Sequence, residues 1–197
     1  MPRSQNSSNH LDHLVVKSPA WPSLLHVLDE LIRSRRTHKA YGSEPVPADV
    51  LRELFELARW APNHHVTNPW RFRVLGPAAR ERLKAAAEEA KPGSGAKLDR
   101  APTLIVVSAK QTGDAEQDRE DVLATAVAAY IVLLGGHARG LAGYWRTVPV
   151  LDSSAGRAAV ALPADETPIG LLHLGEPRQE QRVPERASVD EIAVFLD

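Results

Sequence analysis

Four cations stand within seven residues of one another near the N-terminus: Arg33, Arg35, Arg36 and Lys39, with His38 between them. One or two such charges are explained by the dipole of a preceding helix, whose C-terminal end favours cations by about 0.3 to 1 kcal/mol. Four cations also repel one another. A bound phosphate relieves that repulsion and accepts charge-assisted hydrogen bonds. The pattern therefore indicates either a solvated helix cap or a phosphate site, and spacing alone leaves the two interpretations even.

A second polar segment, residues 60–72, holds two His, two Asn and two Trp between a helical pattern and a strand pattern. In extended backbone, adjacent side chains point to opposite sides, so we do not expect His64 and His65 to bind one metal ion. No metal site is predicted. A polar loop that carries aromatic residues beside an anion site favours a planar heteroaromatic ligand.

The third candidate segment, residues 135–147, is rich in glycine. Gly140 fits the position that follows the last turn of a helix. Gly143 falls inside a strand pattern, which indicates a bulge or a close approach of the backbone to a neighbour such as a flat ligand. The segment matches no phosphate-binding loop, and the chain has no serine-hydrolase elbow.

Composition limits the class of protein. The chain has 197 residues and a formal charge of -1, with 43% hydrophobic and 25% charged residues, as in an ordinary globular domain. A basic RNA binder is disfavoured by that charge. The absence of cysteine excludes disulfides and thiolate metal sites, so redox chemistry would need a bound cofactor. A polar N-terminus and the lack of a long apolar run predict a cytoplasmic protein with no membrane partner.

Apolar spacing predicts alternating helices and short strands after an N-terminal extension, residues 1–20, that we expect to be flexible. The longest helix is apolar almost all round, which indicates burial in the core or in an oligomer interface. An apolar pattern returns at the C-terminus, at 189–195. The predicted helices are 23–34, 47–60, 78–90, 120–139 and 153–160, and the predicted strands are 70–75, 103–109, 141–147 and 168–174.

Together the three segments resemble the flavin-dependent nitroreductase family, in particular its minimal-size branch. That family carries an R-R-S-x-R/K element, an A-P loop that leads into Q-P-W-x-F, and a G-x-G-x-x-W region. The corresponding stretches here are 35–39, 61–72 and 141–147, and residues 169–177 are similar to the last core strand of the family. The match spans about residues 24 to 186.

The resemblance implies an α+β fold with a central mixed or antiparallel sheet flanked by helices, a single FMN-binding domain over residues 21–197, and a homodimer with shared sites. It implies that FMN is the cofactor and that NADH or NADPH is a transient co-substrate. Arg35, Arg36, Thr37 and Lys39 would hold the phosphate and ribityl oxygens, and His64 would face the flavin. The other residues implied to bind it are Asn68, Trp145, Arg146, Thr147 and Arg186, with 145–147 coming from the partner subunit and Arg182 as a rival to Arg186.

Three positions depart from the family pattern: Thr37 replaces Ser, Asn68 replaces Gln, and Val66 stands where many larger members have Asn. The last two leave open which groups contact the flavin pyrimidine. The implied activity is a ping-pong, two-electron reduction of nitroaromatic, quinone or related small acceptors, in which flavin N5 carries the chemistry and no side chain is assigned as catalytic. The alternatives are an FMN-storing or FMN-sensing protein, and a relative that acts on flavin itself or on unsaturated or halogenated substrates.

Overall fold

The computed structural model describes residues 21–196 of the chain. The chain divides into two units, residues 1–34 and residues 35–197. In the first unit the described residues form one helix, α1 (Trp21–Ser34), which ends where the cationic segment begins, as the apolar spacing predicts. The N-terminal extension predicted for residues 1–20 lies outside the described residues. The second unit holds the sheet and all three candidate segments.

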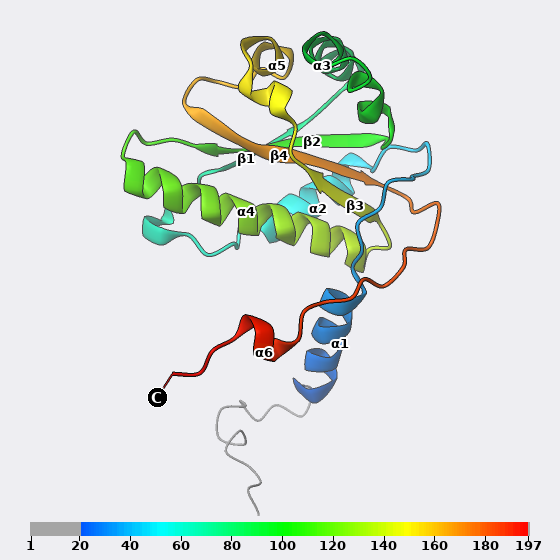
Figure 1. Ribbon diagram of the computed structural model, residues 1–197, viewed down its shortest axis with the longest axis vertical. Coiled ribbons are helices and arrows are strands. Elements are labelled where there is room, and N and C mark those ends of the chain that lie inside the picture. The colour runs from blue at the N-terminus through cyan, green and yellow to red at the C-terminus, as the bar shows by residue number, and fades with distance from the viewer. Residues whose placement is uncertain (1–20, 197) are drawn as a thin grey trace, which may run out of the picture. The chain divides into compact units, whose positions relative to one another are not determined.

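A four-stranded sheet forms the centre of the second unit, with the strand order β1-β2-β4-β3 (Figure 1). The strands are β1 (Trp70–Val74), β2 (Thr103–Lys110), β3 (Ala142–Arg146) and β4 (Glu166–Gly175). Every pair of neighbouring strands is antiparallel. This confirms the predicted α+β class, and of the two predicted sheet types the structure has the antiparallel one. β2 is central, and residues 103–109 of it are buried, as its unbroken apolar run predicts.

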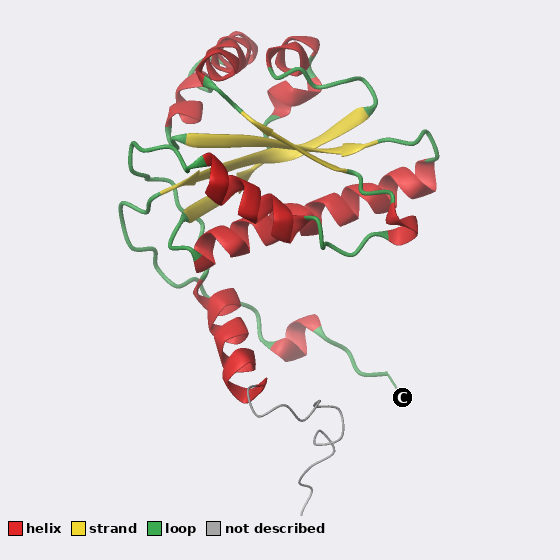
Figure 2. Ribbon diagram, turned by 180° about the vertical axis from the view of Figure 1, so that it is seen from behind, coloured by secondary structure: helices red, strands yellow, loops and turns green. Residues whose placement is uncertain are grey.

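Helices cover both faces of the sheet. α2 (Ala48–Ala58) and α4 (Ala115–Ala138) lie side by side on one face (Figure 2). The other face carries α3 (Pro77–Ala90), α5 (Ser154–Ala159) and the 3-10 turns η2 (Gly95–Asp99) and η3 (Pro149–Asp152) (Figure 1). Alternate residues of β2 face the two sides: Ile105 packs in the α2/α4 cluster and Leu104 in the α3/α5 cluster.

Helix α4 begins at Ala115, five residues before the predicted start at Glu120. Asp114 caps it, since its carboxylate accepts hydrogen bonds from the N–H groups of Glu116 (3.1 Å) and Gln117 (2.9 Å). The added turn contains almost no apolar residue, so apolar spacing could not reveal it. The prediction found the core of the helix and missed its polar first turn.

Helix α4 is long and apolar enough to cross a membrane by length and composition, but half of its apolar stretch is buried within the protein. Its inner side, including Ala128 and Val132, packs against the sheet. On the opposite side Leu123, Val127 and Tyr130 are 61%, 39% and 37% exposed. The helix is therefore a core helix that leaves an apolar stripe uncovered in the single chain.

Two glycines at the end of α4 have different structural reasons. Gly140, at φ +76°, ends the helix in a Schellman motif, because its N–H bonds to His137 O (3.0 Å) and the N–H of Leu141 bonds to Gly136 O (2.9 Å). The predicted cap is confirmed. A Cβ on Gly143 would lie 2.7 Å from Leu133 Cδ2. The close approach predicted for Gly143 is thus made to Leu133 of α4, and the flat ligand suggested at this position stays a prediction.

The chain after β4 contains one short helix, α6 (Val189–Ile192), which begins with a capping box of Ser188 and Glu191. The apolar residues that marked this region in the sequence are exposed, with Phe195 at 90%. β4 begins at Glu166, two residues before the predicted Pro168, because Arg73 and Ser108 hold the Glu166 carboxylate against the neighbouring strands.

Candidate functional site

The cationic segment lies along the free edge of β3. Thr37 forms a parallel bridge with Gly143, and the N–H of His38 donates to Gly143 O at 3.1 Å. Further on, Tyr41 bridges Pro177, and its hydroxyl donates to His38 O at 2.6 Å. Burial, aided by Tyr144, raises the Tyr41 pKa, so that hydroxyl keeps its proton. The backbone of residues 37–41 is therefore pinned beside β3.

Four positively charged or protonatable groups meet at the start of this segment. Each of Arg35 and Arg36 donates from Nη1 to the main-chain carbonyl of the other, at 3.1 and 2.9 Å. Burial, His137 and Arg35 lower the pKa of His38, in that order, and its buried Nδ1 has no hydrogen-bond partner. Burial, Arg35 and Arg36 likewise lower the pKa of His137. This cluster, Arg35, Arg36, His38 and His137, is a candidate anion site, which we call the anion site, and its positive charges oppose protonation of the two histidines.

The remaining predicted phosphate ligands lie at the surface. Thr37 and Lys39 are exposed within the same pinned segment. Arg182 and Arg186 are both exposed in the chain after β4. The structure gives no ground for preferring either of those two arginines.

Trp145 to Thr147 continue along β3 from the bridge. The Trp145 indole N–H donates to Ile169 O at 3.1 Å, and the ring covers Gly170, where a Cβ would lie 2.2 Å from Nε1. The indole is thus held by the chain itself. Because Gly143 O faces the free edge, the two-residue alternation of a strand turns the backbone of Trp145 to the same edge. Trp145 can therefore contact a ligand at this edge through its main-chain groups.

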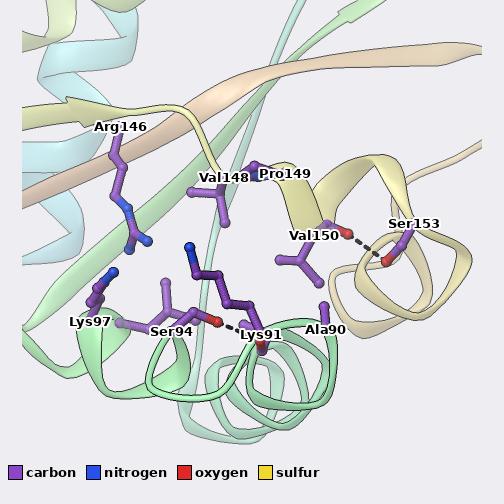
Figure 3. A pocket seen from close by; sticks show the side chains of 11 residues that line it. Ala90, Lys91, Ser94, Lys97, Arg146, Val148, Pro149, Val150 and Ser153 are labelled. Carbon is purple, nitrogen blue, oxygen red and sulfur yellow. Dashed lines mark hydrogen bonds between the residues drawn. The ribbon is translucent and has the colours of Figure 1, made fainter.

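A cavity of about 400 Å³ opens beside the end of β3, between α3, η2 and η3 (Figure 3). The ammonium groups of Lys91 and Lys97 and the guanidinium of Arg146 gather at one end of it, while Val148 and Val150 line the other (Figure 3). Arg146 Nη1 is buried and has no hydrogen-bond partner. This cavity combines an apolar wall with cationic donors.

The polar loop that precedes β1 is organised by Asn63. Its Oδ1 accepts from the Asn68 N–H at 2.6 Å, and its Nδ2 donates to Thr67 Oγ1 at 2.9 Å and to Asp121 Oδ1 at 3.4 Å. Thr67 Oγ1 donates to Asp121 Oδ1 at 2.6 Å. Asp121 is 1% exposed on α4, and Gln117 is its third donor, at 3.0 Å. A buried carboxylate in the core helix therefore anchors the loop.

The same loop holds three residues in left-handed backbone conformations: His65 at φ +56°, Val66 at +53° and Asn68 at +49°. Asparagine tolerates that region, but a β-branched residue there is strained. The segment His64–Val66 forms a 3-10 turn, η1, and the two imidazole rings lie with their centroids 3.9 Å apart. The predicted extended backbone, with the two rings on opposite sides, was wrong because the Asn63 bonds close the turn.

Within one chain these regions do not meet. The loop precedes β1 and contacts Asp121 near the start of α4, whereas the cationic segment lies on β3, where Gly143 packs on Leu133. β1 and β3 are opposite edges of the sheet. Asp121, which anchors the loop, and Leu133, on which Gly143 packs, are twelve residues apart on α4, which corresponds to about 18 Å along the helix. Arg35 to Lys39, Trp145 to Thr147 and the cavity belong together, and His64 with Asn68 stands apart.

Several residues of the site were not found from the sequence. His137 joins the anion site from the end of α4, and Lys91, Ser94 and Lys97 line the cavity from a stretch between a predicted helix and a predicted strand. The signal available in the sequence was the pair Lys91 and Lys97, two lysines six residues apart. Asn63 and Asp121 carried no signal, since their pairing spans 58 positions. Within residues 21–196 there is no cluster of three His, Asp or Glu side chains suited to a metal ion.

Comparison with known proteins gives one consistent result. The model of the Nitroreductase family matches residues 32–176. A Bacillus subtilis protein named as an NAD(P)H nitroreductase, YfhC, is 27% identical over 176 residues, which cover 83% of this chain and 91% of that protein. A nitroreductase-like protein from Bacillus cereus has the same fold, with a TM-score of 0.78 and 24% identity over 86% of this chain and 96% of its own. A Desulfovibrio desulfuricans structure described as a nitroreductase in complex with FMN gives a TM-score of 0.71 at 25% identity, over 86% and 96% of the two chains.

Proposed function

The chain belongs to the Nitroreductase family, and we propose that it is an FMN-dependent NAD(P)H oxidoreductase that reduces nitroaromatic, quinone or related small organic acceptors by two electrons. One observation carries the proposal. An anion site, an open strand edge and a cavity with cationic donors follow one another along β3 in a single chain. That sequence of features matches the phosphate, the chain and the ring of FMN.

The residues fit the phosphate end of FMN. Arg35 and Arg36 would bind the phosphate oxygens, and Thr37 and Lys39 would bind phosphate or ribityl oxygens from the pinned segment. His38 Nδ1 is a buried polar atom without a partner, and His137 faces the two arginines. An anion of charge near -2 would offset the mutual repulsion of these groups. Arg186, or Arg182, would add a late contact.

The residues also fit the ring end. The main chain of Trp145 and Thr147 would lie against the ring, and Arg146, Ser94 and Lys97 would face its pyrimidine side. Cationic donors held there stabilise negative charge on the reduced ring, and they need no reorganisation during the reaction. Because the cavity supplies donors of its own, we propose that the pyrimidine contacts come from the cavity and not from Val66 or Asn68 of the loop.

When bound, FMN would accept a hydride from NAD(P)H and pass two electrons to the acceptor in the same place, in ping-pong order. The chain's own residues have three tasks: to hold the phosphate, to leave one face of the ring open, and to place cations beside it. No side chain of the chain is required to act as an acid or base. The preference between NADH and NADPH stays open.

We propose a cytoplasmic homodimer with two shared sites. The uncovered stripe Leu123, Val127 and Tyr130 on α4 supplies an apolar surface for a second copy. His64 and Asn68 lie too far from Arg35 in one chain to reach the same FMN, so the partner would supply them. This division revises the expectation from the resemblance, in which residues 145–147 came from the partner, because the Thr37 bridge places those residues beside Arg35.

Subunit complementation tests the whole proposal. One variant, Arg35→Ala/Arg36→Ala, breaks the phosphate end, and another, His64→Ala/Asn68→Ala, breaks the loop. If each site takes its two parts from different chains, an equal mixture after subunit exchange recovers about a quarter of the wild-type NAD(P)H oxidation rate, because half the dimers carry one intact site. No recovery would contradict a shared site.

The flavin itself is tested by absorbance. Saturating FMN should give a yellow protein and raise its melting temperature, since ligand at 100 times its Kd stabilises by about 2.7 kcal/mol. Bleaching of the flavin bands by NADPH or NADH under anaerobic conditions would then support an enzyme. A protein that binds FMN but is not reduced would instead be a storage or sensing protein.

A further inference from the structure

The cavity beside β3 holds more positive charge than FMN can neutralise. Lys91, Lys97 and Arg146 converge at one end of it, and no Asp or Glu is among the described residues that line it (Figure 3). The flavin ring is neutral when oxidised and carries at most one negative charge when reduced. Positive charge therefore remains in excess even with reduced FMN in place.

Two carboxylates close to the cavity in the chain, Glu88 and Asp99, are engaged elsewhere. Glu88 accepts from the N–H groups of Gly93 (2.8 Å) and Gly95 (3.1 Å). Asp99 pairs with Lys84 at 2.9 Å, so this third lysine of the region has the counter-charge that Lys91 and Lys97 lack. The acids of this region thus hold the loop and the outer side of α3, and they leave the cationic end of the cavity to an external anion.

The opposite end of the cavity is apolar. Val150 of η3 and the preceding Val148 lie across the cavity from Ala90, the last residue of α3 (Figure 3), and Leu98 is also among the lining residues. An inorganic anion would leave this wall in contact with water. A planar molecule with an apolar body and one anionic substituent would contact both ends, because the wall buries the body and the lysines bind the charge.

Resting on the function proposed above, we propose that the electron acceptor of this site is a small aromatic compound with a carboxylate, and that Lys91 selects it. Lys91 is exposed, whereas Lys97 and Arg146 are half-buried and Nη1 of Arg146 is buried. Lys97 and Arg146 serve the ring, and Lys91 remains for the acceptor. With a nitro compound the reaction is R-NO2 + NAD(P)H + H⁺ → R-NO + NAD(P)⁺ + H2O, and the carboxylate is unchanged.

Binding without turnover is the first test. Benzoate is titrated into the FMN-loaded protein, with benzamide as the neutral match, and binding is followed by calorimetry and by the flavin spectrum. We expect benzoate to bind wild type more tightly than benzamide, and its Kd to rise about five- to tenfold in Lys91→Gln, the effect of one charge-assisted contact. Lys84→Gln removes the same charge from α3, at a position outside the cavity, and should leave the benzoate Kd unchanged.

Kinetics supply the second test. The ratio of kcat/KM for 4-nitrobenzoate to that for 4-nitrobenzamide is measured in wild type and in both variants, so that the intrinsic reactivities of the two compounds cancel. The ratio should fall about five- to tenfold in Lys91→Gln alone. An unchanged ratio with unchanged benzoate binding would overturn the proposal. The proposal would also be overturned if Lys91→Gln lowered the preference for NADPH over NADH and left the ratio for the two nitro compounds unchanged. The cations would then bind the phosphate of the reductant.

The failure of this proposal is distinguishable from that of the proposed function. If the chain takes up no FMN, the oxidoreductase proposal fails, and benzoate titration of the FMN-free protein still tests the cavity. If FMN binds and NAD(P)H reduces it while benzoate and benzamide bind alike, only the acceptor class is wrong.

Discussion

The two ends of the candidate site are built in opposite ways. The anion site at β3 gathers Arg35, Arg36, His38 and His137, lowers the pKa of both histidines, and leaves a buried nitrogen without a partner. The loop before β1 has almost no net charge of its own, and Asn63 closes it by bonds to Thr67, Asn68 and Asp121. The first region carries an electrostatic cost that a ligand would relieve, and the second carries backbone strain that its own bonds maintain.

This difference separates two tasks. A cluster of cations that oppose one another's protonation would bind an anion by electrostatics, so its contribution should appear mainly in affinity. A loop that its own hydrogen bonds close in the free chain is preorganised, so its contribution should appear in stability and in the position of the groups it presents. Variants of the anion site should therefore lose affinity for the ligand. Variants of the loop should lose stability and the correct position of the groups that the loop presents.

The largest effect is expected at the anion site. Arg35→Ala/Arg36→Ala removes two phosphate-directed guanidinium groups, each worth about 1.5 to 3 kcal/mol, and should weaken FMN binding by two or more decades. Riboflavin has no phosphate and should bind wild type and variant with similar weakness. Fluorescence titration of both flavins measures the difference.

A matched control is Arg52→Ala/Arg59→Ala, which removes the same charge from exposed positions of α2 and should keep wild-type FMN affinity. If the Arg35/Arg36 variant also keeps that affinity while its FMN-free form melts lower, the arginines form a helix cap. Arg182 and Arg186 would then be the candidates for the phosphate.

The next effect is expected in the loop. Asn63→Ala removes the acceptor for the Asn68 N–H and a donor to the buried Asp121, which should lower the free energy of unfolding by about 2 kcal/mol. For a chain of this size that corresponds to a fall of about 4 to 8 °C in melting temperature. The variant should also lower kcat/KM while retaining FMN.

Gln117→Ala is the control for the loop, because it removes another donor to the same Asp121 oxygen without touching residues 63–68. It should lose stability and keep kcat/KM. Equal kinetic losses in the two variants would mean that Asp121 supports the core and does not position the loop.

The pH dependence should also differ between the two ends. The pKa values of His38 and His137 are lowered in the folded chain, so the unfolded chain binds protons more readily. The stability that these residues contribute is present above about pH 6.5 and is lost as the pH falls through their lowered values. The melting temperature of the FMN-free protein should fall less between pH 7 and pH 5 in His38→Gln/His137→Gln than in wild type.

His64→Gln/His65→Gln changes two exposed histidines at the other end and should follow the wild-type pH profile. If both double variants reduce the fall in melting temperature between pH 7 and pH 5 equally, the anion site has no special role in that fall. Added FMN should reduce the fall in the melting temperature of wild type between pH 7 and pH 5, because its phosphate favours the protonated histidines.

The sequence predicted what short-range patterns encode. Apolar periodicity located the strands and helices, glycine chemistry identified the cap at Gly140, and the density of arginine marked the anion site. It did not reveal His137 beside Arg35 or Asp121 beneath Asn63, because each pair joins residues far apart in the chain. The turn at His65 was missed because its left-handed backbone depends on those long-range bonds and not on local propensity.

Val66 gives the smallest expected effect and the sharpest test of strain in the loop. Its φ of +53° is costly for a β-branched residue and mild for asparagine. Val66 is also 73% exposed, so its side chain contributes little burial in the single chain. Val66→Asn should therefore raise the free energy of unfolding by about 1 kcal/mol, or about 2 to 4 °C in melting temperature.

Val74→Asn makes the same change at an exposed valine of β1 with no positive φ, where the loss of β propensity should lower stability slightly. Opposite signs at the two positions would establish that the loop stores strain in its backbone. Equal losses would mean that Val66 is accommodated without cost, and the contrast between a strained loop and a charged anion site would then rest on charge alone.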